Sequence, residues 1–435
     1  MSVRRGSRAV LAAWLLAAPA AAEPHGQIGP FDWDLSEGIF YEDASRELRV
    51  DVEGRGALDY LQWDDRNARD TQLRVDRALL GVHASAGSYT DARVIADLVG
   101  IDTPYNLWEA WAALSPGRYA RVTAGLLPIA FGVEHTLGEA AQGLPGRPGF
   151  LAFLTGRTDW ALRLDGELGE GLVYYELTGA LGEGFDLFGQ KRGDPQLSAR
   201  LMSHPLRWLD WSFDLGPYTI PFPSGAFVNF AYAFSSDYDG HLDVATPLRN
   251  KLFDVARLDG QEASFWVFGF GIDLGPFRVM HETTRGSLEG VRLPGGGRQD
   301  FDDQITSWQL VAAWRVTGEP YDSRLFERRD ALRPDPPARP VTGDGAQRGI
   351  GAVELAVRYA NADMDRDLFL PPAQFASEGI SSQEFRQVAA AVNWDPTASL
   401  RVSAEVVRII ADGFPAVFDS HGRDTSYLLR AEIHF

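Results

Sequence analysis

The chain has 435 residues, a formal net charge of −19 at pH 7, 45% hydrophobic residues and no cysteine. The lack of cysteine excludes a disulfide framework, a thiolate metal site and a thiol nucleophile. The acidic balance argues against a nucleic-acid partner, because phosphate backbones require a basic surface. The hydrophobic share, with 11% aromatic residues, excludes a disordered acidic protein. Among the 41 basic residues only Lys191 and Lys251 are lysines, so almost all cationic side chains are arginines.

The first 22 residues have the pattern of a secretory signal peptide. Arg4, Arg5 and Arg8 form a positive segment, an apolar stretch follows from Ala9 to Ala18, and small residues end it at 20–22. We therefore expect a signal peptide over 1–22 and a mature chain that begins at Glu23. The alternative is a membrane-anchor helix, but the apolar stretch is shorter than the roughly 20 residues that span a bilayer.

The end of the chain shows the clearest alternation of apolar and polar residues. Tyr427, Leu429, Ala431, Ile433 and Phe435 are separated by polar or charged residues. Such period-2 patterns predict strands with one apolar face. The same pattern predicts strands over 46–62, 70–86, 89–100, 105–115, 118–128, 157–168, 171–181, 196–204, 208–216, 261–274, 276–288, 305–317, 350–361, 383–394, 398–410 and 425–435. A weaker pattern over 227–234 leaves a further strand or a folded loop open.

The connections between these strands are of two kinds. Tight turns are predicted at 116–117, 169–171, 275–276 and 395–397, where Gly and Pro concentrate. Long loops rich in Gly, Pro and Asp are predicted over 129–156, 182–195, 217–260, 289–304, 318–349, 362–382 and 411–424. Short turns that alternate with long loops are typical of a barrel whose ends face different compartments. We expect one domain over 23–435.

Alternating strands occur both in soluble sandwiches and in transmembrane barrels. Here the polar face repeatedly carries arginine together with Asp or Glu, which suits a confined, wet lumen where opposite charges pair. Aromatic residues near strand ends, including Trp160, Trp308, Trp394 and Trp111, suit girdles at the two membrane interfaces. Together with the signal peptide and the terminal Phe435, these features predict a transmembrane antiparallel β-barrel surrounded by lipids of the bacterial outer membrane.

Several segments resemble the phosphate-selective porin O and P family. The segment from Arg121 to Gly125, continued by 127–134, resembles a family stretch in which a strand ends in a Gly-Gln-Phe-Lys-x-Pro-Phe-Gly-x-Glu-like motif before a long loop. The most specific other segments are 317–319, 354–359 and 393–394. The resemblance covers most of 70–435 and implies an all-β barrel of sixteen strands, with eighteen as the alternative. It also implies a homotrimer that carries small inorganic anions, such as phosphate, across the outer membrane.

Inward-register arginines are the candidate lining of the pore. A guanidinium group matches phosphate and carboxylate oxygens bidentately, and several of them give an anion successive weak sites. The candidates on strands are Arg74, Arg93, Arg121, Arg163, Arg200, Arg278, Arg315, Arg358, Arg401 and Arg430. The alternative is that each arginine pairs with an acid on the same wall. Because many acids fall in the long loops, the inward positions are expected to be richer in arginine than the net charge indicates.

The loop over 129–156 is the candidate constriction, because the resemblance implies that it folds into the barrel. Arg147 and Arg157 are expected to face the narrow part, whereas Glu134 and Glu139 would make it tolerant of cations. At the position of the family's Gly-Gln-Phe-Lys stretch this chain has Gly-Leu-Leu-Pro over 125–128, without lysine. The sequence alone therefore leaves dedicated phosphate binding and a general or carboxylate-permeable pore as alternatives.

Enzyme motifs do not occur in the sequence. There is no Gly-x-x-x-x-Gly-Lys loop, no His-Glu-x-x-His and no Gly-x-Ser-x-Gly, so we expect no catalytic residues, no metal site and no cofactor. Two alternatives to a porin stay open. One is a closed barrel that acts as an adhesin or a structural protein, and the other is an outer-membrane hydrolase using His421 with Ser420 or Ser426.

Overall fold

The structure of the chain is a computed structural model. It describes residues 25–28, 30–34, 38–43, 45, 47–65, 68–99, 107–129, 131–133, 143–145, 158–181, 195–206, 211–215, 218–222, 225–245, 251–293, 296–321, 337–338, 340–341, 349–365, 384–412 and 423–435. The signal peptide predicted over 1–22 lies outside these residues.

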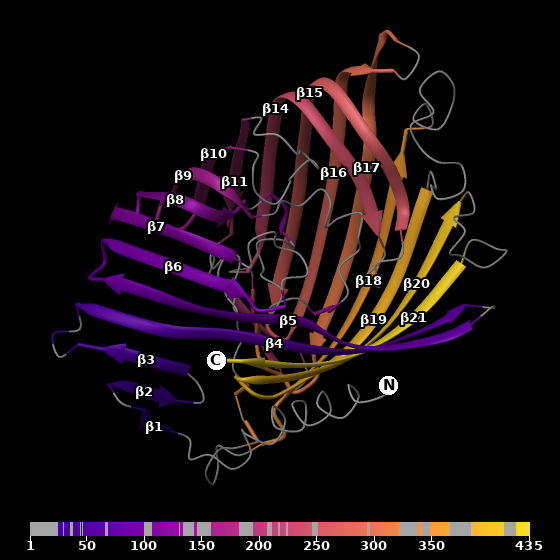
Figure 1. The fold of residues 1–435 in the computed structure, drawn as a ribbon. Coiled ribbons are helices and arrows are strands. Elements are labelled where there is room, and N and C mark those ends of the chain that lie inside the picture. Colours follow the sequence, from indigo (N-terminus) through magenta and orange to yellow (C-terminus); the bar gives the residue numbers. More distant parts are fainter. Residues whose placement is uncertain are drawn as a thin grey trace, which may run out of the picture.

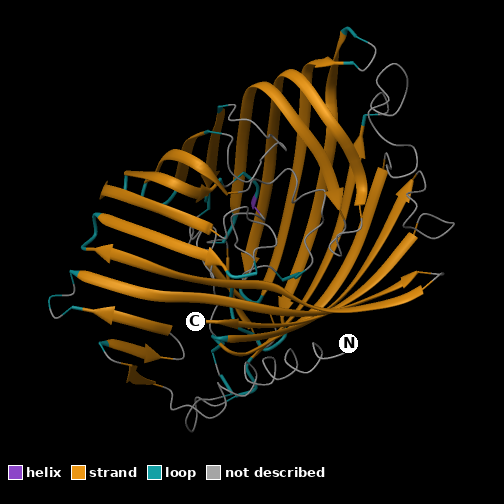
Figure 2. Cartoon of the chain, viewed as in Figure 1, coloured by secondary structure: helices purple, strands orange, loops and turns teal. Residues whose placement is uncertain are grey.

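Nearly all described elements are β-strands (Figure 2). In chain order they are His25–Ile28 (β1), Phe31–Asp34 (β2), Gly38–Glu42 (β3), Leu48–Asp65 (β4), Ala68–Ala86 (β5), Thr90–Asp97 (β6), Leu107–Gly117 (β7), Ala120–Pro128 (β8), Thr158–Leu168 (β9), Val173–Ala180 (β10), Gln196–Ser203 (β11), Trp211–Leu215 (β12), Tyr218–Phe222 (β13), Phe227–Ala245 (β14), Lys251–Leu274 (β15), Phe277–Arg292 (β16), Arg298–Arg315 (β17), Ala352–Met364 (β18), Glu384–Thr397 (β19), Leu400–Asp412 (β20) and Arg423–His434 (β21).

Sixteen of these strands, β4 to β11 and β14 to β21, form a closed antiparallel barrel (Figure 1). Each wall strand pairs with the next along the chain, and β11 pairs directly with β14. The last strand closes the wall by pairing with β4, where Leu429 lies opposite Tyr60 and Ala431 opposite Leu58. Closure leaves no unpaired edge along the wall, which a bilayer would not tolerate. The predicted sixteen-stranded barrel is confirmed, and the eighteen-stranded alternative is wrong.

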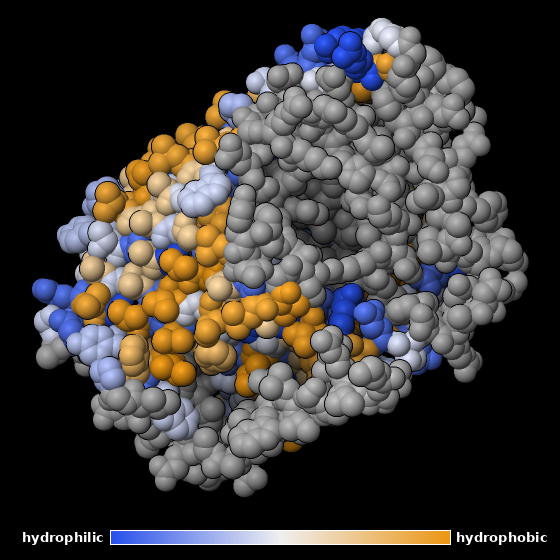
Figure 3. All heavy atoms as spheres, in the orientation of Figure 1, coloured by the Kyte–Doolittle hydropathy of each residue, from blue (hydrophilic) through white to orange (hydrophobic). Residues whose placement is uncertain are grey.

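Side chains alternate between the two faces of the wall. On β18, Leu355, Val357 and Tyr359 are exposed on the outside, whereas Glu354 and Arg358 are buried on the inside. Figure 3 shows the resulting outer surface over β4 to β9, with hydrophobic side chains along the wall and hydrophilic ones at the strand tips. A closed wall with an apolar outer surface belongs in lipid. Within the described part of the chain, no helix is long and apolar enough to span a membrane.

Two segments of the wall differ from the sequence prediction. The predicted strand 208–216 contains β12, which pairs only with β13 in a separate two-stranded sheet. The weak segment 227–234 instead opens β14, a wall strand of 19 residues. The predicted loops 217–260 and 289–304 are therefore wrong. The first range contains β13, β14 and the start of β15, and the second contains the end of β16 and the start of β17. Strands that extend past the bilayer need no apolar outer face, so alternation fades there.

The two ends of the barrel differ in part, because one end has long connections after β8, β10, β18 and β20 and short ones after β4, β14 and β16. The other end has mostly short turns. Short turns join β5 to β6, β7 to β8, β9 to β10, β15 to β16 and β19 to β20, and Phe435 lies at the same end. The connection over 316–351, predicted with the long loops, also leaves from this end because it joins β17 to β18. The strands β1 to β3 extend this end, with β3 paired to residues 49–52 of β4 beyond the reach of β21. Short turns mark the periplasmic end in barrels of this kind.

Candidate functional site: the inner wall of the barrel

Arg430 holds the seam where the barrel closes. Its Nε and NH2 groups donate to the two carboxylate oxygens of Asp59 on β4 at 2.6 and 2.9 Å, and NH2 also donates to Asp76 at 2.7 Å. Arg74 contacts the same two acids at 3.3 and 3.0 Å. A neighbouring pair joins Arg55 to Glu432 at 2.6 Å. The predicted pore arginines Arg430 and Arg74 therefore lie on the inner face, but in ion pairs at the seam.

Two further arginines are held in forked pairs beside the short turns. Arg278 donates to Asp273 at 2.7 and 2.9 Å, and Arg401 donates to Asp395 at 2.6 and 2.9 Å. Each pair spans one tight hairpin, so the carboxylate precedes the turn and the arginine follows it. A bidentate pair satisfies both oxygens of the acid and fixes the guanidinium plane. These arginines stabilise the periplasmic rim of the wall.

Tyr321 brings the 316–351 connection into the barrel. Its ring lies between the guanidinium groups of Arg278 and Arg315, at 4.2 and 4.3 Å from the ring centroid. Its hydroxyl donates to Glu354 at 2.6 Å, and Arg315 lies 3.9 Å from the same carboxylate. Burial raises the pKa of the Tyr321 phenol, so the hydroxyl stays protonated and acts as a donor. The periplasmic end of the lumen thus contains a packed aromatic and ionic cluster.

The arginines on β6, β8 and β9 are also neutralised by acids. Arg93 is buried and donates to Glu53 at 2.8 Å and to Glu109 at 3.3 Å. Arg163 donates to Asp165 at 3.1 Å and to the Pro128 carbonyl at 3.3 Å. The less buried Arg121 lies 3.7 Å from Asp91 and covers the ring of Trp111. Trp111 itself faces inward and donates to Glu109, so its predicted place in an outer girdle is wrong.

The remaining predicted arginines divide into three cases. Arg358 is buried on the inner face of β18. Arg200 is buried on β11, where its Nε donates to the Asn229 side-chain oxygen at 2.7 Å. Arg147 and Arg157 lie outside the described residues. All ten predicted strand arginines are thus on the wall, and Arg200 differs from Arg430, Arg278 and Arg401, whose partners are carboxylates, in having an amide as its hydrogen-bond partner.

Acids outnumber arginines on the inner wall. Among the buried side chains of the described strands, fourteen are Asp or Glu and nine are Arg. The expectation that the inward positions are richer in arginine is therefore wrong for this part of the chain. Strands such as β9, β18 and β21 place an arginine and a carboxylate on the same inner face, and on β8 and β11, which contain no acid, the arginine lies opposite Asp165 or Glu176 of the neighbouring strand. An unpaired buried charge is costly, so arginines on this wall are accompanied by acids.

The described part of the 129–156 loop contacts the inner wall at two places. The backbone N–H of Val133 donates to Glu282 on β16, and the Gly143 carbonyl accepts a hydrogen bond of 2.6 Å from the Asn393 side chain on β19. At both places a larger residue would force the facing glutamate carboxylate to shift. A Cβ at Gly132 would lie 2.7 Å from Glu282, and one at Gly143 would lie 2.8 Å from Glu354. The loop therefore approaches the wall closely at both points.

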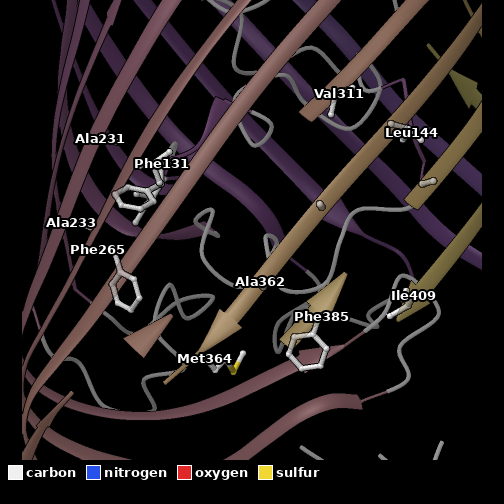
Figure 4. Packing of buried hydrophobic residues seen from close by; sticks show 14 of the residues in the cluster. Phe131, Leu144, Ala231, Ala233, Phe265, Val311, Ala362, Met364, Phe385 and Ile409 are labelled. Atoms are coloured by element: carbon white, nitrogen blue, oxygen red, sulfur yellow. The ribbon is translucent and has the colours of Figure 1, made fainter. Parts of the chain in front are cut away.

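Apolar side chains hold the same loop residues. Ile129, Phe131 and Leu144 are buried in a cluster with the inner faces of β14 to β20 (Figure 4). Alanine is the commonest residue that these strands contribute: Ala231, Ala233, Ala263, Phe265, Val267, Leu288, Val291, Phe301, Val311, Ala313, Ala356, Ala360, Ala362, Met364, Phe385, Ala389, Ala391, Val407, Ile409 and Ala411. The inner wall thus has one apolar sector on β14 to β20. The charged pairs concentrate on β21 and β4 to β11, and at the periplasmic rim.

Some residues of this wall were not singled out from the sequence. Arg55 shares the period-2 register of Asp59, so the alternation of β4 contains the signal that would have found it. Asn229 and Asn393 share the inward register of their strands, and 393–394 was singled out only through the resemblance, so the alternation marks their positions but not their partners. Tyr321 carries no such signal, because its role depends on a contact between segments far apart in the chain. No group of three or more His, Cys, Asp or Glu side chains arranged to hold a metal ion occurs among the described residues.

Comparison with known proteins identifies the fold. No protein-family model matches the chain, and no curated protein matches its sequence. The outer membrane channel DcaP of Acinetobacter baumannii superposes with a TM-score of 0.54 at 11% identity, covering 91% of this chain and 99% of that one. The resemblance to phosphate-selective porins therefore stays a prediction.

Two further solved structures are similar. In-vitro folded OmpT, an outer membrane protein of Vibrio cholerae in its trimer form, has a TM-score of 0.51 at 10% identity and covers 89% of this chain and 99% of that one. Salmonella typhi OmpF in complex with daunomycin has a TM-score of 0.51 at 9% identity and covers 91% of this chain and all of that one, at 100%. The chain therefore has the fold of bacterial outer-membrane channel proteins, and its apolar outer surface fits that membrane.

Proposed function

We propose that the protein is a passive outer-membrane channel, not an enzyme, and that it admits small hydrophilic solutes, small organic anions among them. One observation carries the proposal. The closed sixteen-stranded wall is apolar on its outer face and charged on much of its inner face. A bilayer-spanning wall with a charged interior provides a polar path through lipid, which passive diffusion requires and which a catalytic role would not explain.

The loop over 129–156 forms the constriction in this proposal. Two of its described residues are hydrogen-bonded to the inner wall, Val133 to β16 and Gly143 to β19. Its described apolar side chains are buried against the inner wall. A loop fastened at two points narrows the lumen without closing it by itself. The contacts support an inward-folded loop, and Arg147 and Arg157 remain its candidate charged residues.

The charges favour organic anions over phosphate as solutes. The predicted anion lining is largely neutralised by pairs such as Arg278 with Asp273, and acids exceed arginines among the buried side chains of the described strands. A doubly charged phosphate would meet more repulsion than a singly charged solute in such a lumen. The near absence of lysine in the sequence points the same way. We therefore favour the general or carboxylate-permeable pore over a dedicated phosphate pore.

A homotrimer is part of the proposal. The Vibrio cholerae protein with the same fold is described as a trimer. In this chain the strands β6 to β11 have only 8 to 11 residues, shorter than the 12 to 24 residues of the other wall strands. A short stretch of wall is best placed where neighbouring barrels, and not open lipid, cover it. Crosslinking in native membranes would test this, with a band at three times the subunit mass as the expected product.

Swelling of proteoliposomes tests the channel. The expected result is rapid swelling in isotonic glycine or sodium acetate and slower swelling as the solute grows, because diffusion through a pore is limited by its width. The matched control is the same protein unfolded by heat before reconstitution. A closed adhesin-like barrel predicts no swelling with any solute, and a hydrolase predicts release of fatty acids from the vesicle lipids. Ser420 and His421 of the hydrolase alternative lie outside the described residues.

A further inference from the structure

Arg200 differs from three other buried arginines of the inner wall in its hydrogen-bond partners. Arg430, Arg278 and Arg401 each donate to a carboxylate through two nitrogen atoms at 2.6 to 2.9 Å. Arg200 is 4% exposed and donates only through Nε, to Asn229. Its NH1 and NH2 groups are buried, and no acceptor among the described residues lies within hydrogen-bond distance of them. A buried guanidinium with two unpaired amino groups is costly unless an acceptor reaches it.

The side chain next to Arg200 adds a further donor. The Oδ1 atom of Asn229 accepts the hydrogen bond from Arg200 Nε, which assigns the other end of the amide as the NH2 group. That group is also buried and has no acceptor among the described residues. Three amino groups on β11 and β14 therefore lie together, all of them donors. An oxyanion, which is rich in lone pairs, would satisfy all three at once.

The surrounding charges limit which oxyanion fits. Glu176 lies directly opposite Arg200 on β10, and Glu176 and Glu282 both act electrostatically on its guanidinium group. Their repulsion rises with the charge of a ligand, so a doubly charged phosphate is disfavoured relative to a singly charged anion. A planar carboxylate also matches the two parallel N–H groups of a guanidinium fork.

The other neighbours are apolar. Met202 follows Arg200 on the inner face of β11, Phe227 precedes Asn229 on the inner face of β14, and both are buried together with Val133 of the 129–156 loop. Tyr174 and Met280 pack against the same cluster. A ligand whose carboxylate contacts Arg200 would therefore lay its body against thioether and aromatic groups.

We propose that Arg200 and Asn229 form a binding site for monocarboxylates with an apolar body, at the place where the 129–156 loop meets the wall. This inference rests on the proposed channel function and names a solute class for it. The carboxylate accepts hydrogen bonds from the three amino groups, and Met202, Phe227 and Val133 contact the apolar body. A solute held weakly here is concentrated at the narrow part of the lumen before it passes on.

Calorimetric titration of the detergent-solubilised protein tests the site without reference to transport. The probes are benzoate, acetate and inorganic phosphate at one ionic strength. Benzoate is expected to bind more tightly than acetate, and phosphate more weakly than either. Arg200→Gln is expected to weaken benzoate binding about tenfold or more, since it removes the charge-assisted hydrogen bonds of the fork. Asn229→Ala is expected to weaken it less, because the fork of Arg200 remains.

Further variants separate the fork, the apolar contact and general charge. Arg200→Lys keeps the charge but loses the fork, so the weakening persists. Phe227→Ala weakens benzoate but leaves acetate unchanged. The matched control is Arg386→Gln, which removes an exposed arginine paired with Glu384 on β19 and leaves benzoate binding unchanged. A folded Arg200→Gln or Arg200→Lys protein that binds benzoate as tightly as the wild type overturns the site, as does tighter binding of phosphate than of benzoate.

Block of the ionic current then tests the site within the channel. In planar bilayers, benzoate is expected to reduce the chloride current of the wild type at concentrations about tenfold below those required in Arg200→Gln. Current without any benzoate block overturns the inference and leaves the channel standing. Benzoate binding in the calorimeter without any current does the reverse, because it supports the site and overturns the proposed function.

Discussion

The ion cluster around Arg430 gives the sharpest prediction about stability. Arg430 lies on the last strand and binds Asp59 and Asp76 on the first two wall strands, so it connects the two ends of the sheet across the seam. Replacing it by Gln removes three charge-assisted hydrogen bonds and leaves two buried carboxylates facing one another. The barrel should therefore become easier to open at the seam.

The size of this effect follows from burial and from the remaining partner. Breaking a buried ion pair by removing one member costs about 3–5 kcal/mol. Arg74 stays within 3.3 and 3.0 Å of the two acids and offsets part of that loss, so we expect Arg430→Gln to lower the free energy of unfolding by about 2–3 kcal/mol. The exposed pair of Arg386 and Glu384 is the matched control, for which Arg386→Gln should cost about 1 kcal/mol or less.

Equilibrium urea unfolding in lipid vesicles, followed by tryptophan fluorescence, measures the difference. The double variant Arg430→Gln with Asp59→Asn should recover part of the loss, because it removes one of the carboxylates left without a partner. The reasoning is refuted if Arg430→Gln unfolds at the same urea concentration as Arg386→Gln. It is also refuted if the double variant loses more free energy of unfolding than the two single variants lose together.

Three other predictions concern the loop, the periplasmic cluster and the lipid-facing surface. Gly132→Ala should push the 129–156 loop off the wall and make the single-channel current noisier, whereas Gly117→Ala, with open space around its Cβ position, should not; equal noise would contradict the anchoring. Tyr321→Phe should lower the unfolding free energy by about 1–2 kcal/mol through the lost hydroxyl and Tyr321→Ala by about 3–5 kcal/mol, as urea unfolding would measure; equal losses would contradict the two-part role. Brominated lipids should quench less fluorescence in Trp308→Phe than in the wild type, because Trp308 faces lipid, and quenching should be unchanged in Trp111→Phe, because Trp111 faces inward. Reduced quenching in Trp111→Phe but not in Trp308→Phe would contradict this assignment of the outer and inner faces.

The wall of the barrel was predictable because membrane strands obey one simple rule. Between lipid and lumen, alternate residues must be apolar, and β18 and β21 follow this pattern from end to end. The rule fails where strands leave the bilayer. The distal parts of β14 and β15 contain acidic residues and glycine without alternation, which is why the hairpin they form was predicted as a loop. The sequence favoured 208–216 over 227–234 as a wall strand, and the structure shows the reverse. Both segments are short and aromatic, so their patterns do not distinguish them.

The candidate site was predictable in position but not in partnership. Period-2 register placed all ten strand arginines on the wall, and it could also have found Arg55. It could not tell that Arg278 is held by an acid while Arg200 is not, because that depends on which side chains of neighbouring strands meet. Tyr321 was beyond reach altogether, since it enters the lumen from an irregular connection.

Planar-bilayer recording with the purified, folded protein tests the channel most directly. The account predicts stepwise current increments in potassium chloride as single molecules or trimers insert, with each step proportional to the salt concentration. Protein whose barrel is intact by its heat-dependent migration on a gel, yet which produces no steps, would contradict it.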